Sequence, residues 1–313
     1  MTTGRPTLRE GAICATVLVV WLAITAAFVG LRPEHPALAL LIAVLFFACG
    51  ATRRLVVALL PFIVFGMSYD FMNIVPNYTV NPVDIGGLYE AEKSLFGIDT
   101  AAGRLTPNEF FAIHRSTVAD MLGGVFYLCW VPVPIAFGLY LYFARREKAY
   151  LHFSLVFLLV NLIGFAGYYI HPAAPPWYVA EHGMEFMLGT GGSTAGLGAF
   201  DAMTGLPIFD TLYARNSNVF AAVPSLHSAY TLVAFIYALR FNAPKGWKVA
   251  LGIITLGIWA TAVYTSHHYI IDVTLGILCA LAGYLVFEQG LMRIPAFSRF
   301  IDRYTRYIKP YGN

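Results

Sequence analysis

Long apolar stretches recur along this 313-residue chain, and several of them run for roughly 20 residues. A helix of about that length crosses the roughly 30 Å hydrocarbon core of a bilayer. Within a bilayer only helices and closed barrels satisfy every backbone polar group. Charged residues make up 12% of the chain, against about 25% in an ordinary globular protein. We therefore predict an all-α fold, a polytopic transmembrane helical bundle with loops and interfacial helices on its outer face.

The apolar stretches divide into eight predicted helical spans. These spans cover residues 11–31, 36–51, 54–73, 119–143, 149–170, 224–241, 247–265 and 267–288. The apolar core of the second, from Ala37 to Cys49, is short enough for a re-entrant or thin span, so a six-span bundle is the alternative. The first stretch, from Ala12 to Gly30, is longer than a signal-peptide core and lacks a clear cleavage site, so it is expected to remain as a helix.

Basic residues separate to one side when the spans are placed in alternating order. The side that holds both termini collects 15 of the 20 lysines and arginines. An excess of basic residues marks the cytoplasmic side of a membrane protein. We therefore predict an integral protein of the plasma or inner membrane with cytoplasmic N- and C-termini. Its active site is expected on the outer face, which is periplasmic, extracellular or lumenal.

Four parts follow from this order of spans. They are the N-terminal transmembrane helices (1–80), an outer interfacial segment (81–118), the catalytic transmembrane core (119–290) and a basic cytoplasmic tail (291–313). In the outer segment the apolar residues Leu88, Ala91, Leu95 and Phe96 follow helical spacing among charged residues that include Glu92. This pattern indicates an amphipathic helix on the membrane interface or a loop helix packed on the bundle.

The most informative polar stretch is SHHYIID, residues 266–272, which opens the last predicted span on the outer side. His268 and Asp272 are four residues apart, so on a helix they share one face a turn apart. The carboxylate can then bind one imidazole nitrogen and leave the other as nucleophile or base. A structural pair fits this spacing as well as a catalytic one. Ionisable groups at membrane depth are costly to hold, however, which favours a function.

A second polar stretch, VPSLHSA, covers residues 223–229 and opens the sixth predicted span. Ser225 is the predicted N-cap after the helix-breaking Pro224. The chain enters the membrane at His227, turns in the cytoplasm and returns. We therefore expect His227 and His268 to emerge at matching depth on the outer face.

A third stretch, HPAAPPWY at residues 171–178, leaves the fifth span on the same side. Trp177 and Tyr178 are predicted either to form an aromatic lip that binds substrate over the site or to anchor the chain at the interface, where Trp and Tyr are favoured. His171 is either a further polar group of the site or a structural residue.

The strings PSLHSA and HHYIIDV, with APPWY upstream, resemble the signature of the type 2 phosphatidic acid phosphatase superfamily. They are most similar to its inositol phosphorylceramide synthase branch, the aureobasidin-resistance proteins. The string YEAEKSLFG, residues 89–97, is similar to a motif ahead of that branch's catalytic spans, and the resemblance extends over residues 84–288. It implies that His268 attacks phosphorus, that Asp272 orients His268, and that His227 protonates the leaving oxygen.

The chain departs from the phosphatases of this superfamily, because it has no Lys-x6-Arg-Pro motif ahead of the histidines and carries Ala262 where they place an arginine. The resemblance therefore favours a phosphotransferase that moves a phosphorylated head group, phosphoinositol above all, from a phospholipid to a lipid alcohol such as ceramide through a phosphohistidine. A lipid phosphate phosphatase is the alternative. The partners implied are the two lipids and the bilayer, without nucleic acid, cofactor or metal, and the pattern does not indicate an oligomeric state.

A transferred phosphoryl group needs positive charge or aimed donors around its oxygens. Arg215, in the outer loop before Pro224, is the best-placed cation, although a solvated loop charge is the simpler interpretation. Ser225 and Ser228, at the start of the predicted helix, are the candidate hydroxyl donors.

Three other functions use the same residues. A metal hydrolase would bind its ion with His227, His268 and Asp272, but no further carboxylate cluster supports it. A serine hydrolase would pair Ser225 or Ser228 with the histidine, but no nucleophile elbow is present. A transporter would explain the spans and the buried polar groups. It would not explain why two histidine motifs converge on one face.

Overall fold

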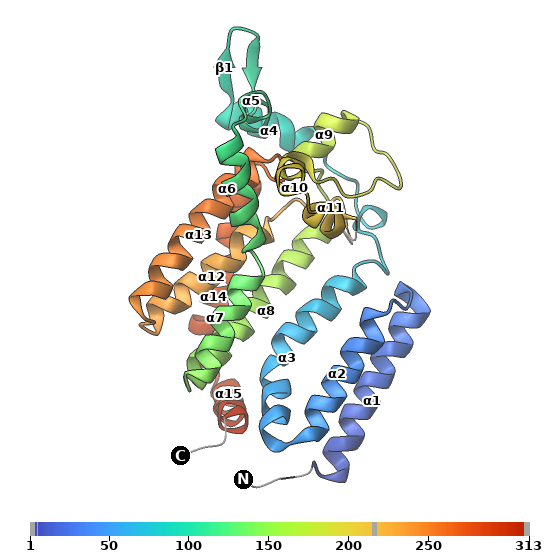
Figure 1. Ribbon diagram of the computed structural model, residues 1–313, viewed down its shortest axis with the longest axis vertical. Helices are drawn as coiled ribbons and strands as arrows, with labels where there is room; N and C mark the ends of the chain where they lie inside the picture. The colour runs from blue at the N-terminus through green and yellow to red at the C-terminus, as the bar shows by residue number, and fades with distance from the viewer. Residues whose placement is uncertain (1–3, 5, 215–217, 310–313) are drawn as a thin grey trace.

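Helices make up most of the molecule, and the long ones run side by side (Figure 1). The computed structural model describes residue 4 and residues 6–214 and 218–309. Arg215, the predicted phosphate ligand, lies outside the described residues.

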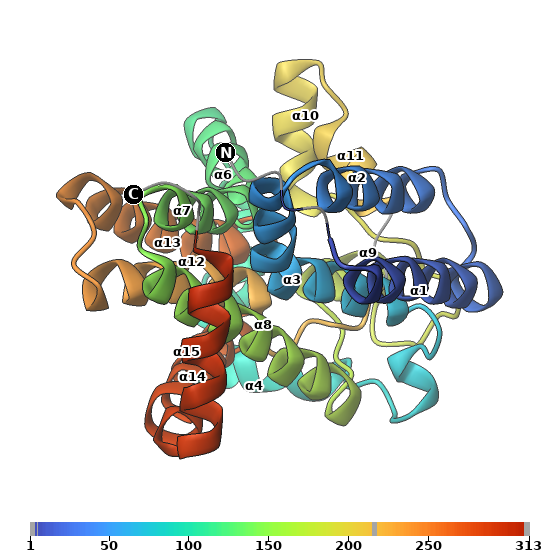
Figure 2. The same ribbon diagram turned by 90° about the horizontal axis from the view of Figure 1, so that it is seen from below.

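The first three helices form a group beside the rest of the bundle (Figures 1 and 2). They are α1 (Leu8–Ile24, extended by a π-helical turn, Thr25–Val29), α2 (Glu34–Ala48) and α3 (Gly50–Phe71). A capping box between Thr7 and Glu10 starts α1. The Tyr150 hydroxyl donates to the Ala58 carbonyl of α3 at 2.7 Å, and this buried bond ties the group to the main bundle.

The main bundle is built around α12, which packs against α8, α13 and α14. Its helices are α6 (Thr117–Leu128), α7 (Pro132–Phe143), α8 (Glu147–Ile170), α12 (Leu226–Arg240), α13 (Lys245–Tyr264) and α14 (Ile270–Leu285). α6 and α7 meet at a bend of 43°, where Pro132 begins the second helix. Proline at a first helical position has no backbone donor to lose, but it cannot continue the preceding helix.

Short elements gather at one end of the bundle, and the start of α1 lies at the other (Figure 1). The first set comprises α4 (Gly86–Phe96), the antiparallel pair β1 (Ile98–Thr100) and β2 (Gly103–Leu105), α5 (Pro107–Ile113), α9 (Pro176–His182), α10 (Gly198–Thr204) and α11 (Ile208–Tyr213). α15 (Pro295–Ile308) lies across the opposite end (Figure 2). The predicted outer loops therefore form one structured layer over the bundle.

Each predicted span coincides with a helix or helix pair, but the helices differ in length. Five are long and apolar enough to cross a membrane, or six if the bent pair at 117–143 counts as one span. These five are Leu8–Val29, Gly50–Phe71, Glu147–Ile170, Lys245–Tyr264 and Ile270–Arg293. α2 and α12 have 15 residues each and fall short of that length. The prediction of an all-α polytopic membrane protein is confirmed, whereas the count of eight spans is not.

α4 packs on the bundle, which is the second of the two alternatives for this segment. It contacts α14 and buries Leu88, Tyr89 and Glu92, whereas Leu95 is 67% exposed. The pattern was therefore misleading about Glu92, which was placed among the charged residues of the polar face and is fully buried.

Candidate active site

The structure brings His227 and His268 into direct contact. The Nδ1 of His227 lies 3.0 Å from the Nε2 of His268. The other ring nitrogen of His268, Nδ1, lies 3.3 Å from the Oδ2 of Asp272. All three side chains belong to the layer where α12 and α14 begin, so the two histidine motifs meet at one level of the bundle. The result is an Asp–His–His line that joins two helices.

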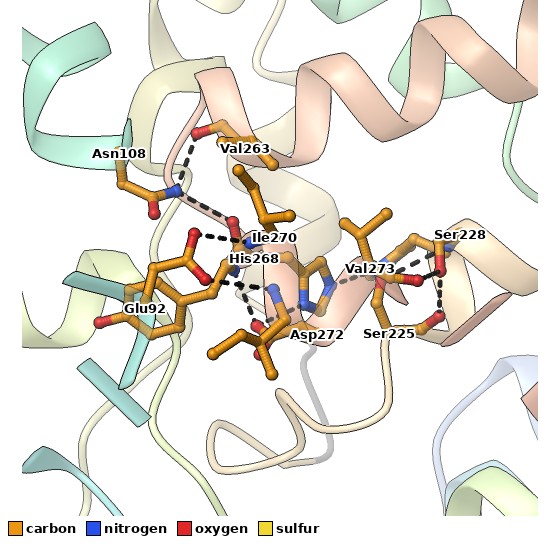
Figure 3. Close-up of polar contacts among 12 residues, drawn as sticks. Glu92, Asn108, Ser225, Ser228, Val263, His268, Ile270, Asp272 and Val273 are labelled. Atoms are coloured by element: carbon orange, nitrogen blue, oxygen red, sulfur yellow. Dashed lines mark hydrogen bonds and ion pairs between the residues drawn. The ribbon is translucent and has the colours of Figure 1, made fainter. Parts of the chain in front are cut away.

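The start of α12 is fixed to α14 by hydrogen bonds rather than by apolar contact alone (Figure 3). The Ser225 N–H donates to the Asp272 carbonyl at 3.0 Å, and the Ser225 hydroxyl caps the helix by accepting the Ser228 N–H. The Ser228 hydroxyl donates to the carbonyls of Ser225 and Val273 at 2.7 and 3.1 Å. These bonds place His227, between the two serines, against His268.

Glu92 caps α14 from outside the helix. Its two carboxylate oxygens accept the N–H groups of Ile270 and Ile271 at 2.9 and 3.1 Å (Figure 3). The first N–H groups of a helix have no partner within the helix, and its N-terminus attracts negative charge. Burial raises the pKa of Glu92, while the two N–H donors act in the opposite direction. Glu92 therefore fixes the first turn of the helix that carries Asp272.

Asn108 fixes the turn that leads into α14. Its side-chain amide donates to the carbonyls of Val263 and His268, both at 2.9 Å (Figure 3). Sequence reasoning missed both Glu92 and Asn108. The signal that could have pointed to Glu92 is the string at residues 89–97, which is similar to a motif of the synthase branch, whereas the amphipathic pattern placed Glu92 on the polar face.

The histidines open into a cavity of about 330 Å³. Its walls are mostly aromatic and come from helices far apart in the sequence. They include Phe65, Tyr69, Tyr127, Trp130, Phe165, Tyr168, Trp177, Phe209, Tyr213 and Tyr230, together with His227, His267 and His268. We call this space the aromatic cavity. No Lys or Arg lies among its lining residues in the part of the chain that the structure describes.

His268 is buried in this environment, and burial disfavours the charged form of an imidazole. If Asp272 accepts the proton on Nδ1, Nε2 carries a lone pair that faces His227. A neutral imidazole oriented by a carboxylate is the arrangement that an attacking nitrogen requires.

The remaining predicted residues lie at different distances from the histidines. Trp177 lines the aromatic cavity, whereas Tyr178 is buried behind it, where its hydroxyl donates to the Glu185 carbonyl and accepts the Met187 N–H, both at 2.8 Å. The hydroxyls of Ser225 and Ser228 are buried in the bonds described above and are not part of the lining.

His171 lies apart from the histidine pair. Its Nε2 is 3.2 Å from the Oδ2 of Asp84, and half of its side chain is exposed. Across the described ranges, no group of three or more His, Cys, Asp or Glu side chains is arranged to hold a metal ion.

Fold and site together define a polytopic membrane protein with a buried histidine pair and an orienting carboxylate at one end of its helices. The family model of the PAP2 superfamily matches residues 95–286. This chain belongs to the PAP2 superfamily. The matched region contains both histidines and Asp272 but leaves out α1 to α3.

Curated relatives place the chain more closely. It is 57% identical over 305 residues to the phosphoinositol dihydroceramide synthase of Bacteroides thetaiotaomicron, an alignment that covers 97% of this chain and 100% of that protein. It is 30% identical over 169 residues to the inositol phosphorylceramide synthase of Candida albicans, covering 51% of this chain and 35% of the relative.

The catalytic subunit of the corresponding synthase from Saccharomyces cerevisiae is 30% identical over 131 residues, covering 41% and 31% of the two chains. No solved structure gives a significant match. The resemblance to the synthase branch is thereby confirmed.

Proposed function

We propose that this chain is a phosphotransferase that moves phosphoinositol from a phospholipid to the hydroxyl group of a ceramide-type lipid. The name of the Bacteroides relative, which aligns over its whole length, supports the head group and the acceptor. The observation that carries the chemistry is the Asp272–His268–His227 line, with contacts of 3.3 and 3.0 Å at the wall of an aromatic cavity.

In the first step the phosphodiester of the donor enters between the two histidines and replaces their mutual hydrogen bond. The negative charge of the phosphodiester stabilises the doubly protonated, cationic form of the His227 ring. The His268 Nε2 forms a bond to phosphorus, the bond from phosphorus to the diacylglycerol oxygen breaks, and His227 gives its proton to that oxygen. Asp272 stabilises the positive charge that develops on the phosphorylated ring.

In the second step the ceramide hydroxyl gives its proton to His227 and forms a bond to phosphorus, and the bond to His268 breaks. Charge and protons balance over the two steps, so no cofactor is needed. The aromatic walls exclude water from the intermediate and leave the lipid hydroxyl as the acceptor. Trp177 contributes to this wall directly, and Tyr178 supports it from behind.

The oxygens of the transferred phosphate still need a positive partner. We retain Arg215 for this role, since it follows α11 in the sequence, three residues before Asn218 of the cavity wall. We propose that Ser225 and Ser228 act by holding the N-terminus of α12, whose free N–H groups face anions favourably.

A test of acceptor dependence separates transfer from hydrolysis. Diacylglycerol release from labelled phosphatidylinositol is measured with purified protein, with and without ceramide. Because the site is built to exclude water, we expect ceramide to raise release by about 10-fold or more. Equally fast release without a lipid acceptor, with free inositol phosphate accumulating, would establish a phosphatase and remove the transferase proposal.

We further propose eight membrane crossings, with α2 and α12 as thin spans, and the four-part division 1–80, 81–118, 119–290 and 291–313. The distribution of basic residues supports cytoplasmic termini and an outer catalytic face.

Thiol labelling tests this orientation. Gly191 and Gly246 both have open space where a side chain would be added, and they lie at opposite ends of the bundle in the proposed topology. In a background without the native cysteines, Gly191→Cys is expected to react with an impermeant thiol reagent outside intact cells. Gly246→Cys is expected to react only after lysis. The reverse pattern would place the catalytic face in the cytoplasm.

A further inference from the structure

A second cavity, of about 530 Å³, adjoins the aromatic cavity on the side of the outer loops. The loop at residues 187–194 forms one wall, the end of α9 contributes Glu181 and His182, and α11 contributes Asp210 and Tyr213. We call this space the polar groove. Its volume lies within the range of about 300–1,000 Å³ that is usual for small-molecule sites.

Tyr213 lines both spaces. Its ring lies 4.8 Å from the ring of His267, which is itself part of the aromatic cavity. The groove therefore begins next to the histidines. A ligand held at His268 can extend on one side among aromatic rings and on the other among polar groups.

The polar groove contrasts with the aromatic cavity in chemistry. Beside two apolar side chains, its wall carries two carboxylates, several hydroxyls and three glycines whose backbone is open to the space; these residues are Met187 and Leu188, Glu181 and Asp210, Thr190, Ser193 and Thr194, and Gly189, Gly191 and Gly192. An acyl chain gains nothing in such a space, because carboxylates and hydroxyls lose hydration against it. A ligand with several hydroxyl groups matches it, since every hydroxyl needs an acceptor and a carboxylate supplies two acceptor oxygens.

Glu181 is held in place by a chain of hydrogen bonds. Its Oε1 accepts the Ser193 hydroxyl at 2.6 Å, and the Ser193 oxygen in turn accepts the Ala195 N–H at 3.0 Å. This chain of bonds fixes one oxygen of the carboxylate and leaves Oε2 for a ligand. Asp210 is positioned through its backbone, because its N–H donates to Asp201 at 2.9 Å. Side chains or backbone fixed in advance cost less entropy on binding.

We propose that the polar groove binds the polyol ring of the donor lipid, with Glu181 and Asp210 accepting hydrogen bonds from its hydroxyls. This inference rests on the proposed transfer of phosphoinositol and assigns the part of the site that selects the head group. The phosphate lies at His268, the ring extends past Tyr213 into the groove, and the lipid chains lie toward the aromatic cavity. The two carboxylates accept hydrogen bonds from a neutral polyol. They repel a head group that bears further phosphates, because both carry negative charge.

The test compares two donors that differ only in the head group. Diacylglycerol release from phosphatidylinositol and from phosphatidylglycerol with identical acyl chains is measured with saturating ceramide, for the wild type and for Glu181→Gln and Asp210→Asn. Glu185→Gln is the matched control, because Glu185 is an exposed acid just ahead of the 187–194 loop and does not line the groove. Each reaction is repeated without ceramide.

For phosphatidylinositol we expect each groove variant to lower kcat/KM about 10-fold through KM. Phosphatidylglycerol, whose head group has two free hydroxyls where the inositol ring has five, should change less than about 2-fold, and Glu185→Gln should match the wild type with both donors. Equal loss with both donors, or no loss with either, would overturn the polyol assignment. Release that does not depend on ceramide would instead overturn the proposed transfer, while the donor preference of the groove variants would still be measured.

Discussion

His268→Ala is expected to lower the rate of the proposed phosphoinositol transfer by about 10³-fold or more, because in the proposed mechanism it removes the nitrogen that forms the bond to phosphorus. His227→Ala is expected to cost about 10²- to 10⁴-fold, the range for losing a general acid and base. His267→Ala should cost far less. The Nδ1 of His267 contacts the Thr265 hydroxyl at 3.0 Å rather than Asp272, so its ring is not oriented for attack.

The measurements are turnover of labelled phosphatidylinositol in the presence of ceramide and circular dichroism to establish that each variant is folded. A donor labelled in the inositol ring should also leave an acid-labile label on the wild-type protein and none on His268→Ala. Substantial turnover by a folded His268→Ala protein would remove the nucleophile assignment. Chelators should leave all rates unchanged, and strong inhibition by them would revive the metal hydrolase interpretation.

The helices could be placed from the sequence because their signal is local. An apolar stretch of sufficient length favours a membrane helix by its own composition, independently of the rest of the chain. Their exact lengths could not be placed in the same way. The predicted span 119–143 is one mostly apolar stretch in the sequence, yet it forms two helices, α6 and α7, which meet at a bend of 43° where Pro132 begins the second.

The meeting of His227 and His268 was predictable from topology, because two spans separated by one returning span begin at the same end of the bundle. The residues that fix the relative position of the two histidines were not predictable from the sequence. Glu92 lies 178 positions from Ile270, and in the sequence it is one acid among others on a surface helix. Only the three-dimensional structure shows that α4 places this carboxylate against the N-terminus of α14.

The first 80 residues carried no signal of function, yet Phe65 and Tyr69 of α3 line the aromatic cavity. They also lie outside the region that the family model matches. Aromatic residues in an apolar helix have the same composition whether they face lipid or a substrate. Sequence alone therefore could not assign α3 a part of the site.

The closest approach in the site depends on Gly276, one of 28 glycines in the chain. It lies four residues after Asp272 and so on the same face of α14, toward α12. A Cβ at this position would lie 2.1 Å from both the Ser225 carbonyl oxygen and the Ser228 Oγ. The first of these is backbone at the start of α12, so the overlap is relieved only if the two helices separate.

Gly276→Ala is therefore expected to lower the melting temperature and to reduce turnover by about 10²-fold or more, since a displacement of about 1 Å at a catalytic pair has an effect of that size. Gly66→Ala is the matched control, because Gly66 lies within α3 with nothing within 4 Å of the added Cβ. It should fold and turn over as the wild type does. If Gly276→Ala keeps the wild-type melting temperature and kcat, the contact between the start of α12 and α14 does not set the distance between His227 and His268. Loss of turnover with an unchanged melting temperature would show that the contact acts on the geometry of the pair rather than on folding.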